Sequence, residues 1–466
     1  MDAFRHYLKG LEKSSELQCF SSPISVRYET AAVMQKLEKE RGPAALFTNL
    51  PSFRNWSLVG NLYTSLKRLA FGLNLPHGTA FKPSLLKRCA QPATDSLGPD
   101  DYGNFKKKPP FQENTHCQNI DLSTLLPVPI HCAHDSGPFI TAGIIIAKNP
   151  LTEKMGMQVI MIEVRPGNRL VISPVTPPLD AFCKQAEEKN YSLEAAVVIG
   201  VEPALMFAAC SPPLLFKGNK LALAAVLRGS PIPLTSCETV SIEVPAGAEV
   251  VLEGVIIPRE RTKMGPWGNY LKTYSWDDSK PVMEVRSVRY RANPIYQDIL
   301  AHGKETIILM ALPTEIILYQ ELTASFSNVQ DVHITHESCG LQAIISLQST
   351  NGNTLREIIE FALNRFFIKS CFLVDTDINI YDQDEVAWAM ATRVQARKDF
   401  IILPGMPALP LDPSAFQGKT DKWGINATRK SFFSPGGFPR ADLPQEVKTK
   451  IASQWETLTA KKQLIF

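Results

Sequence analysis

The sequence has 466 residues, which is enough for two to four domains at roughly 100–200 residues per domain. Its 49 Lys and Arg nearly balance its 46 Asp and Glu, so the formal charge of +3 gives no reason to expect nucleic acid or an anionic membrane as the main partner. With 44% apolar and 20% charged residues, and no apolar run near the roughly 18 residues of a membrane helix, the composition is that of a soluble globular protein.

The first residues lack a cationic flank followed by an apolar stretch, so we expect no secretory signal. There are nine cysteines and no pair has CxxC spacing, which favours reduced thiols in an intracellular, cytoplasmic protein. Only eight histidines are present, so an enzyme that depended on histidine or on a metal ion would have few candidate residues.

The first region alternates between helical and extended patterns up to about residue 83. Helices are predicted at 4–11 and 30–41, an extended segment at 22–27 and a strand at 45–50. Thr30 can cap the second helix, and Gly42-Pro43 can stop it. Residues 92–114 are rich in Pro, Gly, Asp and Lys and are predicted to be a linker, with a solvated lysine run at 106–108.

The middle region, from about 120 to 310, is dominated by segments rich in Val and Ile with turn residues between them. Strands are predicted at 139–147, 156–164, 170–175, 241–244, 249–257 and 281–290, with helical inserts at 180–189 and 221–227. This pattern indicates a β-barrel-like middle domain.

The last region, from about 313, alternates again between helices and strands. Helices are predicted at 355–367 and 384–397, with an apolar strand at 371–375 between them. Residues 445–462 place Val447, Ile451, Trp455 and Leu458 on one helical face, which predicts an amphipathic helix that packs on the body or on a second subunit.

Three segments have residues that could carry chemistry. His131, Cys132 and His134, and also His333, His336 and Cys339, could each be part of a zinc site, although ordinary loop or strand positions explain them as well. Asp375 and Asp377 could hold a cation or cap a turn. The segment 263–270, with two glycines around Pro266 and Trp267, predicts a tight loop whose Trp either walls a pocket or packs on the core.

Further motifs resemble a known family. They are Arg5, Gly42-Pro43, Gly60-Asn61-Leu62, Leu125-Leu126-Pro127-Val128-Pro129, Ile140-Thr141-Ala142-Gly143, Asn168-Arg169-Leu170, Gly200-Val201-Glu202-Pro203-Ala204, Val244-Pro245-Ala246-Gly247-Ala248-Glu249, Thr392-Arg393 and Trp423-Gly424-Ile425-Asn426-Ala427-Thr428. In collinear order across the chain, they resemble the UbiD-like decarboxylases, the ferulic acid and 3-polyprenyl-4-hydroxybenzoate decarboxylases.

The resemblance implies a fold of mixed α+β and α/β class, in three parts. These are an N-terminal α/β region with linker at 1–114, a central split β-barrel domain of flavin-reductase type at 115–312, and a C-terminal α/β domain at 313–466. It implies reversible decarboxylation of unsaturated or aromatic acids with prenylated flavin mononucleotide, a divalent metal such as manganese, and potassium. It also implies a homodimer formed through the C-terminal domain.

The sequence departs from this family at the positions that carry its chemistry. The metal-binding Asn, His and Glu of the family align with Gly156, Pro177 and Lys220. The Arg and the two Glu residues that handle the substrate align with Met161, Met264 and Asn269. No histidine occurs between His134 and His302. From these replacements we expect that prenylated flavin, manganese and potassium are all lost, and that no cofactor is bound.

The leading hypothesis is a cofactor-independent lyase, cyclase or isomerase that holds a small unsaturated or aromatic compound in the old cofactor cavity. We expect Lys220 as a base and Asn269 as an oxyanion donor. The expected substrate-binding residues are Gly156, Met161, Pro177, Met264, Trp267 and Tyr270. Two alternatives remain open: a non-catalytic subunit or binding partner of an active homologue, and a decarboxylase with an altered flavin or none.

Overall fold

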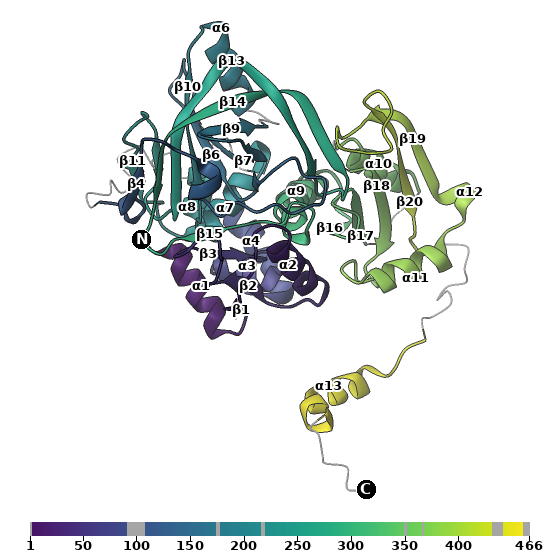
Figure 1. Cartoon of the computed structure of the whole chain (residues 1–466). Coiled ribbons are helices and arrows are strands. Elements are labelled where there is room, and N and C mark those ends of the chain that lie inside the picture. The colour runs from purple at the N-terminus through teal and green to yellow at the C-terminus, as the bar shows by residue number, and fades with distance from the viewer. Residues whose placement is uncertain are drawn as a thin grey trace.

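The computed structural model describes residues 2–90, 108–173, 178–215, 220–348, 352–365, 368–430 and 441–459. Its first part is a four-stranded sheet in the order β1-β2-β3-β15. The strands are β1 (Leu17–Phe20), β2 (Ala44–Phe47), β3 (Ser57–Gly60) and β15 (Ile295–Gln297), and the helices are α1 (Ala3–Lys13), α2 (Glu29–Lys39), α3 (Leu66–Gly72) and α4 (Phe81–Cys89). Because β15 comes from the end of the middle region, the first two parts of the chain share this sheet (Figure 1).

The middle part is a curled nine-stranded sheet in the order β5-β8-β9-β14-β13-β10-β6-β7, with β4 paired to β14. Its strands are β4 (Asn114–His116), β5 (Phe139–Ile140), β6 (Ile144–Lys148), β7 (Met155–Val159), β8 (Ile162–Val164), β9 (Arg169–Ile172), β10 (Leu193–Ile199), β13 (Val250–Gly268) and β14 (Tyr274–Tyr290). The helices α5 (Leu122–Leu125), α6 (Leu179–Glu188), α7 (Pro203–Cys210) and α8 (Lys220–Arg228) and the small pair β11 (Leu234–Ser236) and β12 (Glu243–Pro245) complete it. The curled sheet confirms the predicted split-barrel fold.

The hairpin β13–β14 corrects the expectation of a loop at 263–270. Strand β13 continues to Gly268, and its register against β14 shifts between Thr262 and Met264 and again between Met264 and Trp267. Bulges of this kind let a strand contain Gly and Pro without ending. The hairpin therefore extends from the barrel toward the last part of the chain, where its turn lies near β16 and β17 (Figure 1).

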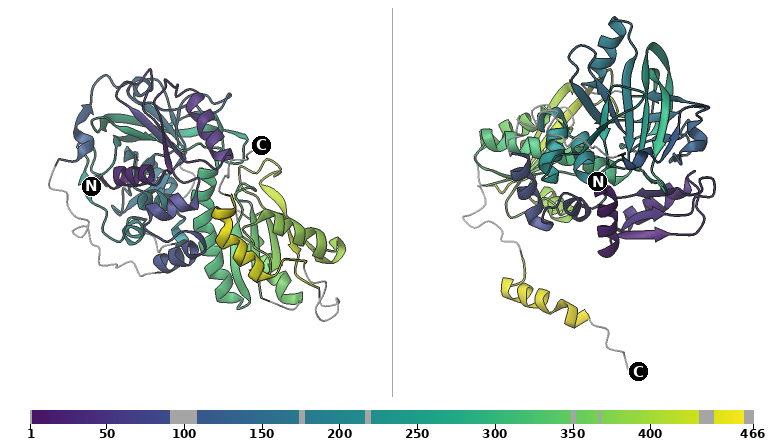
Figure 2. Two further views of the ribbon diagram at one scale, coloured as in Figure 1. Left: turned by 90° about the horizontal axis from the view of Figure 1, so that it is seen from below. Right: turned by 90° about the vertical axis from the view of Figure 1, so that its left-hand side faces the viewer.

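The last part is a five-stranded sheet in the order β16-β17-β18-β20-β19. Its strands are β16 (Val329–Ile334), β17 (Gln342–Leu347), β18 (Ser370–Asp375), β19 (Phe400–Pro407) and β20 (Lys419–Asn426), and its helices are α10 (Gly352–Leu363), α11 (Gln383–Arg393) and α12 (Ala396–Asp399). Helix α13 (Gln445–Thr459) stands apart from the sheets described above (Figures 1 and 2).

The 22-residue helix α9 (Lys304–Ser325) joins the middle part to the last sheet, and the expected boundary at 312 falls inside it. By length and composition alone it could cross a membrane, but 56% of its apolar window is buried in the body, as in a core helix. Next to it, Lys82 of α4 makes ion pairs with Glu315 (2.9 Å) and Asp331 (2.6 Å). These buried pairs join the first part of the chain to the last.

Two local expectations need correction. Thr30 lies inside α2, which begins after Tyr28, so it does not cap that helix. Residues 22–27 form no strand, and the extended segment is β1, a few residues earlier. All nine cysteines are described and none forms a disulfide, in agreement with the expected reduced thiols. Most of the predicted linker lies outside the described residues.

Candidate active site

Two of the expected substrate-binding residues, Met161 and Met264, meet in a small apolar cluster. We call this the methionine cluster; it consists of Phe139, Met161, Val171, Met264 and Trp267. Met264 is fully buried and Trp267 is 8% exposed, with its ring centroid 6.2 Å from that of Phe139. Met161, just before β8, is partly buried, whereas the other four members are buried.

The buried carboxylate of Glu163 positions the strand segment that carries Met264. Glu163 is 1% exposed and accepts hydrogen bonds from the Gly265 amide (2.9 Å), the Ser136 hydroxyl (2.7 Å) and Arg165 (3.1 Å). Gly265 has φ +85°, and a Cβ there would lie 2.6 Å from the Trp267 ring. Sequence reasoning missed Glu163, because a single carboxylate within a Val- and Ile-rich run forms no motif.

Asn269 holds the turn of the hairpin. Its Nδ2 donates to Thr273 Oγ1 (3.0 Å) and Ser275 Oγ (2.7 Å), and its Oδ1 accepts from the Leu271 amide (2.8 Å). Both polar atoms are thus used by the protein itself. Burial raises the pKa of the neighbouring Tyr270, and the Cys339 thiol raises it further. Because Cys339 belongs to the last part of the chain, the Tyr270 ring lies near that part.

The remaining predicted residues contact other elements. Lys220 Nζ donates to the Ala209 carbonyl (2.7 Å) near the end of α7, and burial lowers its pKa to about 8. Gly156 lies under α6, where a Cβ would be 2.7 Å from Pro178 Cγ. Pro177 lies outside the described residues. The structure therefore brings Met161, Met264 and Trp267 together, whereas Lys220 and Gly156 contact α7 and α6.

A cavity of about 340 Å³ lies beside the hairpin. It is lined by Tyr28, Ala31, Ala32, Gln35, His131, Ala133 and His302, and we call it the histidine hollow. Cys132, between two of these residues, has its Sγ 3.3 Å from His302 Nδ1. Asp135 accepts from the Cys132 amide and the Gly268 amide, both at 2.8 Å, and so joins the hollow to the hairpin. The volume is within the range of small-molecule sites, about 300–1,000 Å³.

The possible metal sites have other partners. His333 Nδ1 is 3.0 Å from Glu315, and His336 Nε2 is 2.8 Å from Glu337. Asp377 is 2.5 Å from Arg393, which also contacts Asp375 at 3.2 Å. Among the described residues, His, Cys, Asp and Glu side chains form no group of three that could hold a metal ion.

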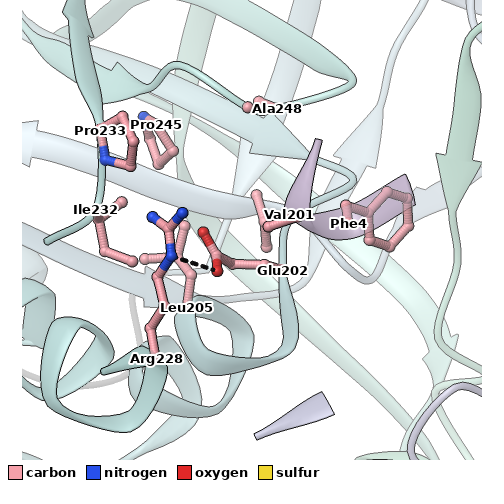
Figure 3. Close-up of a pocket in the computed structure, with 11 residues that line it drawn as sticks. Phe4, Val201, Glu202, Leu205, Arg228, Ile232, Pro233, Pro245 and Ala248 are labelled. Carbon is pink, nitrogen blue, oxygen red and sulfur yellow. Dashed lines mark ion pairs between the residues drawn. The ribbon is translucent and has the colours of Figure 1, made fainter. Parts of the chain in front are cut away.

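A second, much smaller cavity of about 20 Å³ lies between α7, the end of α8, the segment before β11 and the end of β12 (Figure 3). Arg228, at the end of α8, makes an ion pair here with Glu202 at 3.3 Å. This volume holds about one water molecule. It is too small for an organic substrate.

Three family models match consecutive parts of the chain. They describe the N-terminal domain (residues 8–83), the Rift-related domain (104–304) and the C-terminal domain (307–427) of 3-octaprenyl-4-hydroxybenzoate carboxy-lyase. The three-part arrangement is therefore that of a carboxy-lyase class.

Relatives of known activity and solved structures match over nearly the whole length. An anhydromevalonate phosphate decarboxylase of Methanosarcina mazei is 28% identical over 95% of this chain and 100% of its own, and a phenolic acid decarboxylase of Bacillus subtilis is 27% identical over 97% of each. The UbiD-class enzyme HmfF from Pelotomaculum thermopropionicum, in complex with FMN, is 31% identical with a TM-score of 0.87, covering 97% of this chain and 99% of that one. The chain belongs to the UbiD family.

These comparisons overturn the expectation that no cofactor is bound. The similar HmfF structures contain FMN and, in an evolved dimeric form at 30% identity and a TM-score of 0.83, prFMN. The side chains at the positions aligned with the metal ligands do not by themselves decide whether a flavin binds. Those side chains themselves still do not fit a metal: Gly156 has no donor atom, and the Lys220 amine already bonds to a carbonyl. No catalytic step can therefore be derived through a metal at the aligned positions.

Proposed function

We propose that this protein is a lyase of small-molecule metabolism that removes CO₂ from an unsaturated or aromatic carboxylic acid. Family membership over the whole chain supports the reaction class, since the similar curated proteins are decarboxylases. The phenolic acid decarboxylases among them support an aromatic acid as substrate.

The observation that carries the proposal is the methionine cluster. Met161 and Met264 replace charged side chains with thioethers that cannot bind a carboxylate through an ion pair or carry a proton. A carboxylate next to Met161 loses much of its hydration, and its charge spreads as the bond to CO₂ breaks. An apolar wall thus disfavours the ground state more than the transition state. The cluster orients the substrate and excludes water.

Lys220 stays a candidate for proton transfer in this proposal, whereas Asn269 takes a role other than the oxyanion donor expected from the sequence. Because burial lowers the Lys220 pKa to about 8, its ammonium group is a stronger acid than that of an ordinary lysine and can donate the proton that replaces CO₂ on carbon, after which solvent reprotonates the amine. Asn269 is better suited to holding the hairpin turn, since Thr273 and Ser275 already accept from its Nδ2. We expect Lys220→Ala to lower kcat, and Asn269→Ala to change KM and kcat together through the position of the hairpin.

The test is CO₂ release from a panel of cinnamic and hydroxybenzoic acids. The enzyme is prepared with and without co-expression of a flavin prenyltransferase, and its absorbance is recorded. We expect release from at least one acid, and a loss of about tenfold or more in kcat for Met161→Gln. Leu151→Gln, at a residue that is 49% exposed, is the control and should retain full activity. Release of CO₂ from none of the acids in either preparation would contradict the proposal.

The same incubations separate the other activities expected from the sequence. An isomerase or cyclase would convert a substrate to a product of unchanged mass, whereas a decarboxylase yields a product lighter by CO₂. A non-catalytic subunit would give no product alone and would gain activity on mixing with an intact relative. The cytoplasmic location also stays a prediction.

We further propose that the chain forms a homodimer through its C-terminal part. Val447, Ile451, Trp455 and Leu458 of α13 are 40%, 40%, 59% and 58% exposed, and Ile402 on edge strand β19 is 61% exposed. Helix α13 lies away from the rest of the chain (Figure 2), and a helix with exposed apolar residues can cover such an edge on a second copy. Light scattering should show a dimer that Ile451→Asp converts to monomer, while Lys450→Asp, on the same helix, should not.

A further inference from the structure

The histidine hollow has two unlike walls. Helix α2 contributes the methyl groups of Ala31 and Ala32, together with the Gln35 amide and, just before the helix, the Tyr28 phenol. The opposite wall contributes the His131 and His302 rings. A flat molecule with an apolar body and one polar end matches this division, since its body can lie on the alanines while its end meets the imidazoles.

His131 is held by a buried carboxylate. Its Nε2 lies 2.9 Å from Asp298 Oδ2, and the other Asp298 oxygen accepts from the Thr141 hydroxyl at 3.0 Å. Asp298 is fully buried, and an unpaired carboxylate there would be strongly unfavourable. Burial is the largest single influence and opposes the charged imidazole, but the Asp298 charge, the hydrogen bond to Asp298 and the Asp135 charge together outweigh it, so the pKa of His131 is raised. The ring is thus fixed in direction and favours the cationic form.

His302 is the uncharged counterpart on the same wall. Burial first, and the nearby His131 charge second, lower its pKa, while Asp135 partly opposes them. Its Nδ1 contacts the Cys132 Sγ, whose pKa burial raises to about 11, so that the thiol is neutral as well. The hollow therefore presents one imidazole that Asp298 fixes in direction and favours in its protonated form, beside a second imidazole that disfavours the charge.

We propose that the histidine hollow binds a small aromatic or unsaturated organic anion through its carboxylate, with His131 as the charged anchor and α2 as the apolar floor. The distance between His131 and Asp298, the fixed ring and the cavity volume carry this assignment. The ligand class rests on the proposed function; the existence of the site does not.

The physical role of the hollow differs from that of the methionine cluster. A cation beside a carboxylate stabilises the charged ground state, whereas CO₂ leaves as a neutral molecule, so an anchor of this kind opposes decarboxylation at the anchored group. The carboxylate held by His131 is therefore one that is retained. The two regions would act on different groups or on different molecules.

Isothermal titration with sodium benzoate as the probe tests the site, with benzamide as the uncharged analogue. We expect benzoate to bind, benzamide to bind at least about tenfold more weakly, and His131→Gln to lower benzoate affinity at least about tenfold. His134→Gln, at an exposed histidine three residues further on, is the matched control and should change affinity less than about twofold. Ala32→Phe fills the hollow from an exposed helix position, so it provides a second test if His131→Gln does not fold.

The results have separate meanings for the two proposals. Benzoate binding that requires His131, in a protein that releases CO₂ from none of the acids, would support the hollow and contradict the proposed function. CO₂ release together with benzoate affinity unchanged by His131→Gln and by Ala32→Phe would overturn the hollow and leave the proposed function standing. Failure of the wild-type protein to bind benzoate would also overturn it.

Discussion

Removal of the Glu163 carboxylate should destabilise the hairpin segment that carries Met264. Glu163→Ala leaves the buried Gly265 amide without its acceptor and removes the contacts to Ser136 and Arg165. Hydrogen bonds to a charged group contribute about 1.5–3 kcal/mol each. Because the partly exposed Arg165 can bond to water instead, we expect Glu163→Ala to lower the free energy of unfolding by about 2–4 kcal/mol. Glu163→Gln retains an acceptor for Gly265 and should lose only about 1 kcal/mol.

The assay is urea unfolding, combined with hydrogen exchange of the Gly265 and Gly268 amides, because a chain of three parts need not unfold in one step. Glu12→Ala, at an exposed position of α1, is the control and should stay within about 0.5 kcal/mol of the wild type. If Glu163→Ala behaved like Glu12→Ala and left amide exchange unchanged, the carboxylate would not anchor the segment and the reasoning would fail.

Three other substitutions probe packing and charge. Gly156→Ala should lose about 1–3 kcal/mol through its clash with α6, whereas Gly137→Ala, where a Cβ meets only one atom at 3.9 Å, should lose much less in the same urea assay. Lys220→Met should be more stable than wild type by about 2 kcal/mol at pH 6–7. Below pH 8 the amine of Lys220 is charged in both the folded and the unfolded wild type, and burial disfavours that charge in the folded state. Between pH 8 and the usual pKa of 10.5 the folded amine becomes neutral, so the stability advantage of Lys220→Met should shrink. Lys82→Met should lose about 3–5 kcal/mol, seen as a lower melting temperature, because Glu315 stays buried without its cation.

Hydrophobic periodicity predicted the fold well where one face of an element is buried. It failed for α7, in which seven of eight residues are buried, and for α9, whose buried residues lie on several faces. In such helices apolar residues occupy every face, so no helical period is visible in the sequence. The Gly-Pro-Trp-Gly segment was predicted to be a loop because bulges that keep a strand intact depend on its partner strand.

The site was less predictable than the fold. Alignment with the family identified Met161 and Met264, and the structure brings them together. His131 and Asp298 are 167 positions apart, and only the fold shows that they form a pair. Burial lowers the pKa of Lys220 to about 8, and only the fold shows that this side chain is buried against α7. Chemistry that depends on long-range pairs leaves no local signature.

The two hydrogen bonds that Asp135 accepts offer a way to detect ligand binding in solution. One Asp135 oxygen accepts from the Cys132 amide and the other from the Gly268 amide at the end of β13, each at 2.8 Å. Gly268 directly follows Trp267 in the chain. An event in the hollow that shifts the Cys132 turn must therefore change the surroundings of the Trp267 indole. The fluorescence difference between wild type and Trp267→Phe would then serve as a built-in optical reporter for molecules that are themselves invisible to spectroscopy.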